Sequence, residues 1–269
     1  MAKNSKAEFV ASLERGLRVL QTFSREHPQL TLSEVATLTE LTPATARRSL
    51  HTLESLGYIG RSGRRFLLRP KVLAIGTGYL SAINAEVVLQ PFLQDVVNEL
   101  GGSSSVTVLD DVDIVYIAHA SLNRAIRLTA GAGSRYPVYP TSMGRVLLAG
   151  LAPDALDAYL AGTELRPLTP KTITSPDKLR ATLGRVASQG YALVDQELEI
   201  GLRSIAVPVH VRRRVVAALN VSMHASRGSS EAARRELLPP LRETAAAIES
   251  DLAAAPAAAS LLTTPRPPG

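Results

Sequence analysis

The chain has 269 residues, 45% of them hydrophobic and 20% charged, which is typical of globular proteins with one large domain or two ordinary ones. Its lack of cysteine excludes disulfides and cysteine-ligated metal sites. No apolar run approaches the length of a membrane span, and the polar N-terminus lacks the apolar stretch of a signal peptide. We therefore expect a soluble cytoplasmic protein with no membrane partner.

The positive charge is concentrated in the first quarter of the chain. Residues 1–70 hold 11 Lys and Arg against 6 Asp and Glu, whereas residues 71–269 hold 19 against 18. A basic module on a nearly neutral body favours a polyanionic partner at one end. Charge alone leaves a solvated basic surface as the alternative.

An amphipathic helix is predicted from Phe9 to about Arg25, with Ser12 or the polar residues before it as the cap. Its apolar positions recur at helical spacing and are expected to face the core. They are Leu13, Leu17, Leu20 and Phe23.

Two further helices follow. Thr31 and Glu34 have the spacing of a capping box and predict a short helix. Thr42 is the predicted N-cap of a third helix, with Pro43 as its first residue and Gly57 as its left-handed end. The inward positions expected in this helix are Ala46, Leu50, Leu53 and Leu56.

The outward face of the third helix is small and basic, as a helix that reads the major groove requires. Segment 61–65 follows as an arginine-rich hairpin turn, the form of a wing. This order of elements predicts a winged helix-turn-helix bound to double-stranded DNA, with a protein-docking winged helix as the alternative. The predicted DNA-contacting residues are Thr31, Ser33, Thr42, Ala44, Thr45, Arg47, Arg48, His51, Arg61, Arg64 and Arg65.

The remainder predicts an α+β domain. Helix is expected over 70–101 with an interruption near Asn84, then strands over 105–109, 114–119 and 125–129. Helices over 142–148, 154–161, 177–189 and 231–252 enclose a strand hairpin over 204–223. The predicted division is a flexible N-terminus (1–8), a winged helix-turn-helix (9–69), a linker helix (70–84), a C-terminal domain (85–252) and a disordered tail (253–269).

The turn at 141–144 opens a helix, where free backbone N–H groups suit a carboxylate; simple helix capping is the alternative. Ser142, His119 and His210 could form a triad on paper, yet no Gly-x-Ser-x-Gly motif exists, so we predict no catalytic residues. The histidines show no metal-ligand spacing, and we predict no metal and no cofactor. The basic turn 212–214 is interpreted as a solvated turn rather than a second nucleic-acid patch.

The chain resembles the IclR family of bacterial transcriptional regulators, in particular the subgroup that controls protocatechuate, 4-hydroxybenzoate and β-ketoadipate catabolism. The resemblance covers about 9–252 and is carried by several ordered segments. They include SLERGLRVL (12–20), LTLSEVA (30–36), ATARRSL (44–50), TSMGRVLLA (141–149) and EIGLRS (199–204). It implies a GAF-like effector-binding domain and homodimers that often pair into tetramers.

The resemblance also implies an effector pocket for an aromatic or dicarboxylic acid. Asp195 is carried over with Val194 as the alternative position, and Arg127 and Arg203 are neighbours whose roles are either structural or carboxylate-pairing. The carried-over residues are Leu128, Tyr136, Ser142, Met143, Asp195, Ser204, Asn220 and Ser222, and Arg203 is added to them as a predicted effector-binding neighbour. A small-acid hydrolase and a ligand sensor that docks on protein are the competing interpretations.

Overall fold

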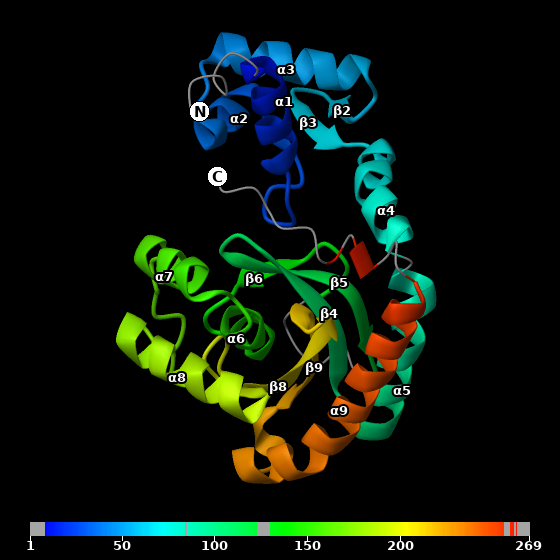
Figure 1. Cartoon of the computed structure of the whole chain (residues 1–269). Coiled ribbons are helices and arrows are strands. Elements are labelled where there is room, and N and C mark those ends of the chain that lie inside the picture. Colours follow the sequence, from blue (N-terminus) through cyan, green and yellow to red (C-terminus); the bar gives the residue numbers. More distant parts are fainter. Residues whose placement is uncertain (1–8, 84, 123–129, 256–258, 261, 263–269) are drawn as a thin grey trace, which may run out of the picture. The chain divides into compact units, whose positions relative to one another are not determined.

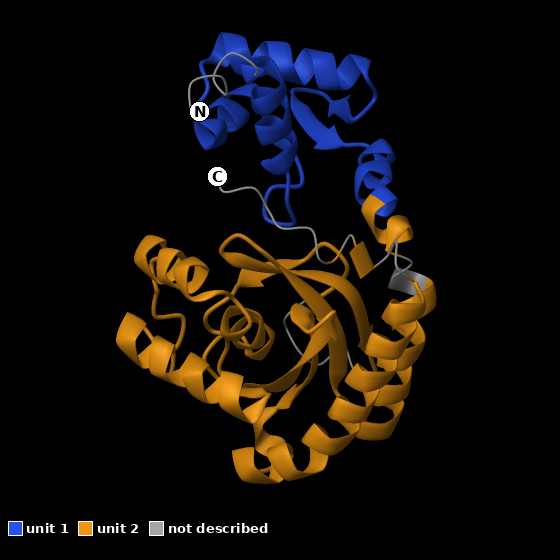
Figure 2. Cartoon of the chain, viewed as in Figure 1, with its two compact units in different colours: residues 1–78 blue, residues 79–269 orange. Residues whose placement is uncertain are grey.

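The computed structural model describes residues 9–83, 85–122, 130–255, 259–260 and 262. The chain divides into two compact units, residues 1–78 and 79–269 (Figure 2). Among the described residues, no single helix is long and apolar enough to cross a membrane, and segments Pro70–Ala82 and Val87–Leu100 pass that test of length and composition only as a bent pair.

The first unit is a winged helix-turn-helix (Figure 1). Its elements are α1 (Ala11–Gln21), β1 (Leu30–Thr31), α2 (Leu32–Thr39), α3 (Pro43–Ser55), β2 (Ile59–Ser62) and β3 (Arg65–Leu68). The strands form a small antiparallel sheet in the order β1-β3-β2. A 3-10 turn (Pro70–Val72) and α4 (Leu73–Ala82) follow, and α4 ends just before the interruption expected near Asn84, which lies outside the described residues.

The predicted packing of α1 is wrong in part. Its N-cap residue is Val10, which makes no side-chain capping bond, so Ser12 does not cap it. Val19 and Phe23 are buried, whereas Leu13 and Leu17 are 62% and 47% exposed. Apolar residues occupy two neighbouring faces of this helix, and their spacing alone does not say which face packs. Leu56 of the third helix is likewise exposed.

The second unit is the predicted α+β domain. Its antiparallel sheet has the order β6-β5-β4-β9-β8-β7. The strands are β4 (Ser103–Asp110), β5 (Asp113–Ser121), β6 (Arg135–Pro137), β7 (Ala192–Asp195), β8 (Leu202–Val211) and β9 (Arg214–His224). The expected strand over 125–129 falls outside the described residues, and β6 and β7 were not anticipated.

Helices cover both faces of this sheet (Figure 1). A π-helical turn (Ala85–Leu89), α5 (Gln90–Leu100) and α9 (Ser230–Ala254) pack on one face with an aliphatic core. The opposite face, which we call the α6 face, is covered by α6 (Ser142–Ala149), with α7 (Pro153–Gly162) and α8 (Pro176–Gln189) beyond it. A 3-10 turn (Ala225–Arg227) precedes α9.

The predicted disordered tail does not begin at residue 253. Helix α9 continues to Ala254, and Ala259 is buried against the aliphatic core with Leu262 beside it. Alanine-rich composition suggested disorder, yet alanine also fits a tightly packed helix surface.

Candidate functional site

Helix α3 begins and packs as the sequence predicts. The Thr42 hydroxyl accepts a hydrogen bond from the backbone N–H of Thr45 at 3.3 Å, and Pro43 occupies the first turn. Ala46, Leu50 and Leu53 are buried, and their burial fixes the rotation of the helix.

The opposite face of α3 presents its basic side chains to solvent. Arg47, Arg48 and His51 are exposed, and neither arginine has an ion-pair partner within the described part of the chain. Ala44 is exposed at the start of the same helix. Free guanidinium groups beside a small residue suit close approach to a groove lined by phosphates and base edges.

The three wing arginines are not equivalent. Arg61 lies 3.2 Å from a carboxylate oxygen of Glu54, and its guanidinium carbon lies 4.7 Å from the centre of the Phe66 ring. Arg65 lies 3.5 Å from a Glu34 oxygen and donates to the Gln29 carbonyl. Arg64, at the tip of the turn, has no ion-pair partner among the residues described. The sequence did not reveal these pairings, because the partners lie in other elements.

The polar residues at the start of α2 are partly committed to local structure. The backbone N–H and the hydroxyl of Thr31 both donate to Glu34, and these bonds hold the pKa of Glu34 below its usual range. The predicted capping box is therefore present, whereas Ser33 is exposed beside it.

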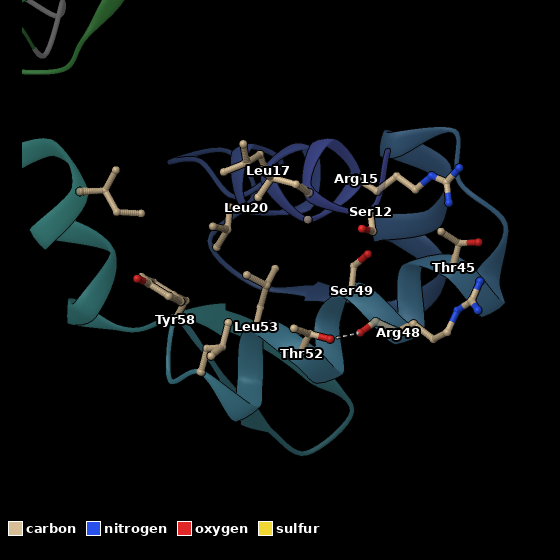
Figure 3. A pocket seen from close by; sticks show the side chains of 14 residues that line it. Ser12, Arg15, Leu17, Leu20, Thr45, Arg48, Ser49, Thr52, Leu53 and Tyr58 are labelled. Carbon is tan, nitrogen blue, oxygen red and sulfur yellow. Dashed lines mark hydrogen bonds between the residues drawn. The ribbon is translucent and has the colours of Figure 1, made fainter. Parts of the chain in front are cut away.

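A groove of about 740 Å³ lies between α1 and α3, with apolar side chains at one end and Thr45 and Arg48 at the other (Figure 3). Leu17 and Leu20 face Leu53 and Tyr58 across it (Figure 3). The exposed Leu13 and Leu56 also line it. Exposed leucines gathered at one end of a groove suit a contact with another molecule.

In the second unit, polar side chains gather on the α6 face. Strand pairing places Ser105 opposite both His119 and Asn220, and Ser204 opposite Ser222. These residues and Thr107 alternate with aliphatic residues that point into the other core. Ser105, Thr107, His119, Ser142, Ser204, Asn220 and Ser222 are called the polar cluster below.

Hydrogen bonds link members of the polar cluster in pairs. The Ser142 and Ser204 hydroxyl oxygens are 2.8 Å apart, and Ser105 Oγ is 2.9 Å from His119 Nδ1. Asn220 Nδ2 donates to Ser222 Oγ at 2.8 Å. Burial lowers the pKa of His119, which favours the neutral form of its imidazole.

Helix α6 supplies the end of the site. The Thr141 hydroxyl accepts from the backbone N–H of Gly144 at 3.0 Å, and Ser142 and Met143 are buried in the first turn. The half-buried Tyr136 contacts Tyr116 edge-on, with ring centres 5.7 Å apart. Predicted residues Ser142, Met143, Ser204, Asn220 and Ser222 thus meet on one face, while Leu128 and Arg127 lie outside the described residues.

Asp195 and Arg203 do not join the polar cluster. They pair with each other across β7 and β8, with Arg203 Nε 2.8 Å from Asp195 Oδ1, on the face opposite Ser204. Burial raises the pKa of Asp195, but hydrogen bonds from Arg203 and Lys171 hold it below its usual range. Val194, the alternative position, pairs with Ser204 instead. A shift of one residue along a strand reverses the side-chain face, and this parity explains the misplacement.

Sequence reasoning missed Ser105, Thr107 and His119 as neighbours of the site. Ser105 and Thr107 alternate with Val106 and Val108 in this strand, and that alternation was the available signal. The hypothetical triad is not assembled, because Ser142 bonds to Ser204 and His210 to Glu249. Within the described ranges, no cluster of three or more metal-ligating side chains is found.

Comparison with known proteins decides the family. Residues 12–63 match the IclR helix-turn-helix domain, and residues 77–250 match the C-terminal domain of bacterial IclR transcriptional regulators. The chain belongs to the IclR family. The predicted function, a DNA-binding transcriptional regulator, and the predicted fold class are therefore confirmed.

The relatives include two named transcriptional regulators and a homologue bound to an aromatic acid. The Pca regulon regulatory protein of Pseudomonas putida is 41% identical over 234 residues, which are 86% of this chain and 80% of that protein. The p-hydroxybenzoate hydroxylase transcriptional activator of Acinetobacter baylyi is 33% identical over 244 residues, 88% of this chain and 90% of that protein. An IclR homologue from Microbacterium hydrocarbonoxydans, crystallised with 4-hydroxybenzoate, has a TM-score of 0.77, with 26% identity, 90% coverage of this chain and 99% of that one.

Proposed function

We propose that this IclR-family regulator binds a small aromatic carboxylic acid at the α6 face and that the acid changes its affinity for operator DNA. The observation that carries the proposal is the polar cluster, most of whose side chains are buried and which a hydrogen bond between Ser142 and Ser204 links to the first turn of α6. Relatives that regulate aromatic-acid genes, and one bound to 4-hydroxybenzoate, support the choice of ligand class. Control of aromatic-acid catabolism genes by this chain follows from the same proposal.

The acid's carboxylate is assigned to the N-terminus of α6. Backbone N–H groups there carry the positive end of the helix dipole, and the Ser142 hydroxyl adds a donor. Met143 and Tyr136 supply apolar surface for a ring. In this assignment the carboxylate does not pair with Arg203. That guanidinium is already paired with Asp195 on the face of the sheet opposite α6.

Titration of the full chain with 4-hydroxybenzoate, protocatechuate and β-ketoadipate in a calorimeter tests this assignment. We expect saturable heat with at least one aromatic acid, with one site per chain. Ser142→Phe is expected to abolish it, because a bulky ring would fill the start of α6. Absence of heat with all three acids would refute the effector proposal.

For the DNA interface, we propose that the exposed face of α3 lies in the major groove. Arg47, Arg48 and His51 contact base edges or phosphates, and Arg64 at the wing tip contacts the backbone. Arg61 and Arg65 shape the wing through Glu54 and Glu34, so their contribution to binding is indirect. Thr42 and Thr45 lie at the start of α3, near the phosphates in this arrangement. Their hydroxyl groups remain bonded to each other at the helix cap.

We also propose that a second copy of the chain covers the apolar end of the groove between α1 and α3, where Leu17, Leu20 and Leu53 lie, and leaves Thr45 and Arg48 at the other end to DNA (Figure 3). A homodimer formed there presents two recognition helices to half-sites about 34 Å apart or a multiple of it. In the double variant Leu13→Lys with Leu17→Lys, both lysines would enter the interface and disrupt it. We expect the full chain to sediment more slowly than the wild type, as a monomer in place of a dimer or as a dimer in place of a tetramer. Leu168→Lys, an exposed apolar position in the second unit, is the control. Identical sedimentation of the double variant and the wild type would contradict this interface.

A further inference from the structure

Two buried polar groups on the α6 face have no hydrogen-bond partner. They are the hydroxyl of Thr107, which is 0% exposed, and Oδ1 of Asn220, which is 2% exposed. Among the described residues only Tyr159 and Thr163 share this condition, and both belong to the region of α7. Such groups are rare in native proteins because leaving them unpaired is costly, so each is expected to meet a partner, either an ordered water or a ligand group.

The two unpaired groups are neighbours on adjacent strands. Thr107 on β4 lies opposite Ala218 on β9, and Asn220 is the next residue of β9 on the same face. Diagonal neighbours of this kind have Cα atoms roughly 7–8 Å apart, within reach of a single small group placed between their side chains. The sheet therefore holds both groups on rigid backbone, rather than on loops.

The rest of the polar cluster does not satisfy them. Ser105 is bonded to His119, and Ser142 to Ser204. Asn220 uses its Nδ2 on Ser222, which leaves its carbonyl oxygen as a lone acceptor. An acceptor needs a donor hydrogen, and an ionised carboxylate has none to give. A hydroxyl group can donate to Asn220 Oδ1 and at the same time accept from the Thr107 hydroxyl.

We infer that Thr107 and Asn220 read a hydroxyl group on the acid bound at the α6 face. This inference rests on the proposed function and sharpens it: the effector is a hydroxy-substituted acid, and acids without a hydroxyl bind poorly. Thr107 was not among the residues carried over from the family resemblance. It determines specificity, whereas α6 holds the carboxylate.

Calorimetric titration of the full chain with 4-hydroxybenzoate and with benzoate, which lacks only the hydroxyl, tests the inference. Benzoate is expected to bind the wild type about tenfold or more weakly, because it leaves both groups unpaired. Thr107→Val keeps the side-chain shape and removes the hydroxyl. It is expected to weaken 4-hydroxybenzoate binding about tenfold and to leave benzoate binding unchanged.

The melting temperature of ligand-free Thr107→Val adds a second readout. Loss of an unpaired buried hydroxyl should leave the melting temperature unchanged or raise it, whereas loss of a structural hydrogen bond would lower it. Ser104→Ala is the matched control: its buried hydroxyl donates to the main-chain oxygen of Asn220 at 2.8 Å, not to the unpaired side-chain oxygen. That variant should lose stability and keep the preference for the hydroxy acid.

Three outcomes would overturn the inference. Equal affinity of the wild type for the two acids would remove it while leaving the effector proposal in place. An undiminished preference in Thr107→Val would show that Thr107 does not read the hydroxyl. Binding of neither acid would refute the proposed effector and this inference together.

Discussion

Replacement of Arg47 and Arg48 by alanine is expected to weaken binding to the operator by about 30-fold or more. Each arginine that contacts a base edge contributes about 1–3 kcal/mol, and both side chains here are exposed without an ion-pair partner in the described ranges. Each lost phosphate contact should also reduce the slope of log affinity against log salt by about one unit. Fluorescence anisotropy with a duplex selected from a randomised library measures both quantities.

Arg180→Ala provides the matched control for these arginines. Arg180 is an exposed residue of α8 in the second unit, paired with Asp157, so its removal changes net charge without touching α3. We expect the control to bind the duplex nearly as tightly as the wild type. Affinity and salt slope that stay unchanged in Arg47→Ala with Arg48→Ala would show that α3 does not read DNA.

Breaking the buried ion pair between Arg145 and Glu197 is expected to destabilise the second unit by about 3–5 kcal/mol. The two side chains are only 3% and 10% exposed, with Arg145 Nη2 2.6 Å from Glu197 Oε2. Arg145 also donates to the Tyr139 carbonyl, and Glu197 accepts from the Ile173 N–H. The pair therefore ties α6 to the segment after β7.

Glu197→Leu leaves the Arg145 charge buried without its partner, which is the source of the expected loss. Urea denaturation followed by circular dichroism gives the free energy of unfolding. The double variant Arg145→Met with Glu197→Leu should recover most of the loss, because it removes both charges and keeps apolar volume. If Glu197→Leu is as stable as the wild type, the buried charge of Arg145 must be stabilised by water or by another group, and the prediction is wrong.

Local signals allowed α3 to be predicted almost completely. Thr42 as cap, Pro43 at the first turn and Gly57 with positive φ each act within a few residues, so short-range chemistry determines them. The face of α1 that packs depends on partners far along the chain, and there the prediction erred. The pairings of Arg61 and Arg65 were also not predictable from local sequence. Both arginines lie in strands, and their carboxylate partners lie in helices α3 and α2.

The effector site could be predicted only in part, for reasons of strand geometry. Ser142, Ser204, Asn220 and Ser222 lie together as the family resemblance implied. Asp195 lies on the face opposite Ser204 because side chains alternate along a strand, so an alignment shift of one residue moves a side chain across the sheet. Thr107 was missed because its role depends on what its neighbours leave unpaired, which requires the coordinates.

The central claim is that an aromatic acid bound in the second unit alters DNA binding by the first. The most direct measurement is the dissociation constant for the selected duplex with and without saturating 4-hydroxybenzoate, at fixed salt. Linkage predicts a change of about fivefold or more, in either direction, and the same factor in the affinity for the acid when DNA is bound. A dissociation constant unaltered by an acid that demonstrably binds would contradict the account.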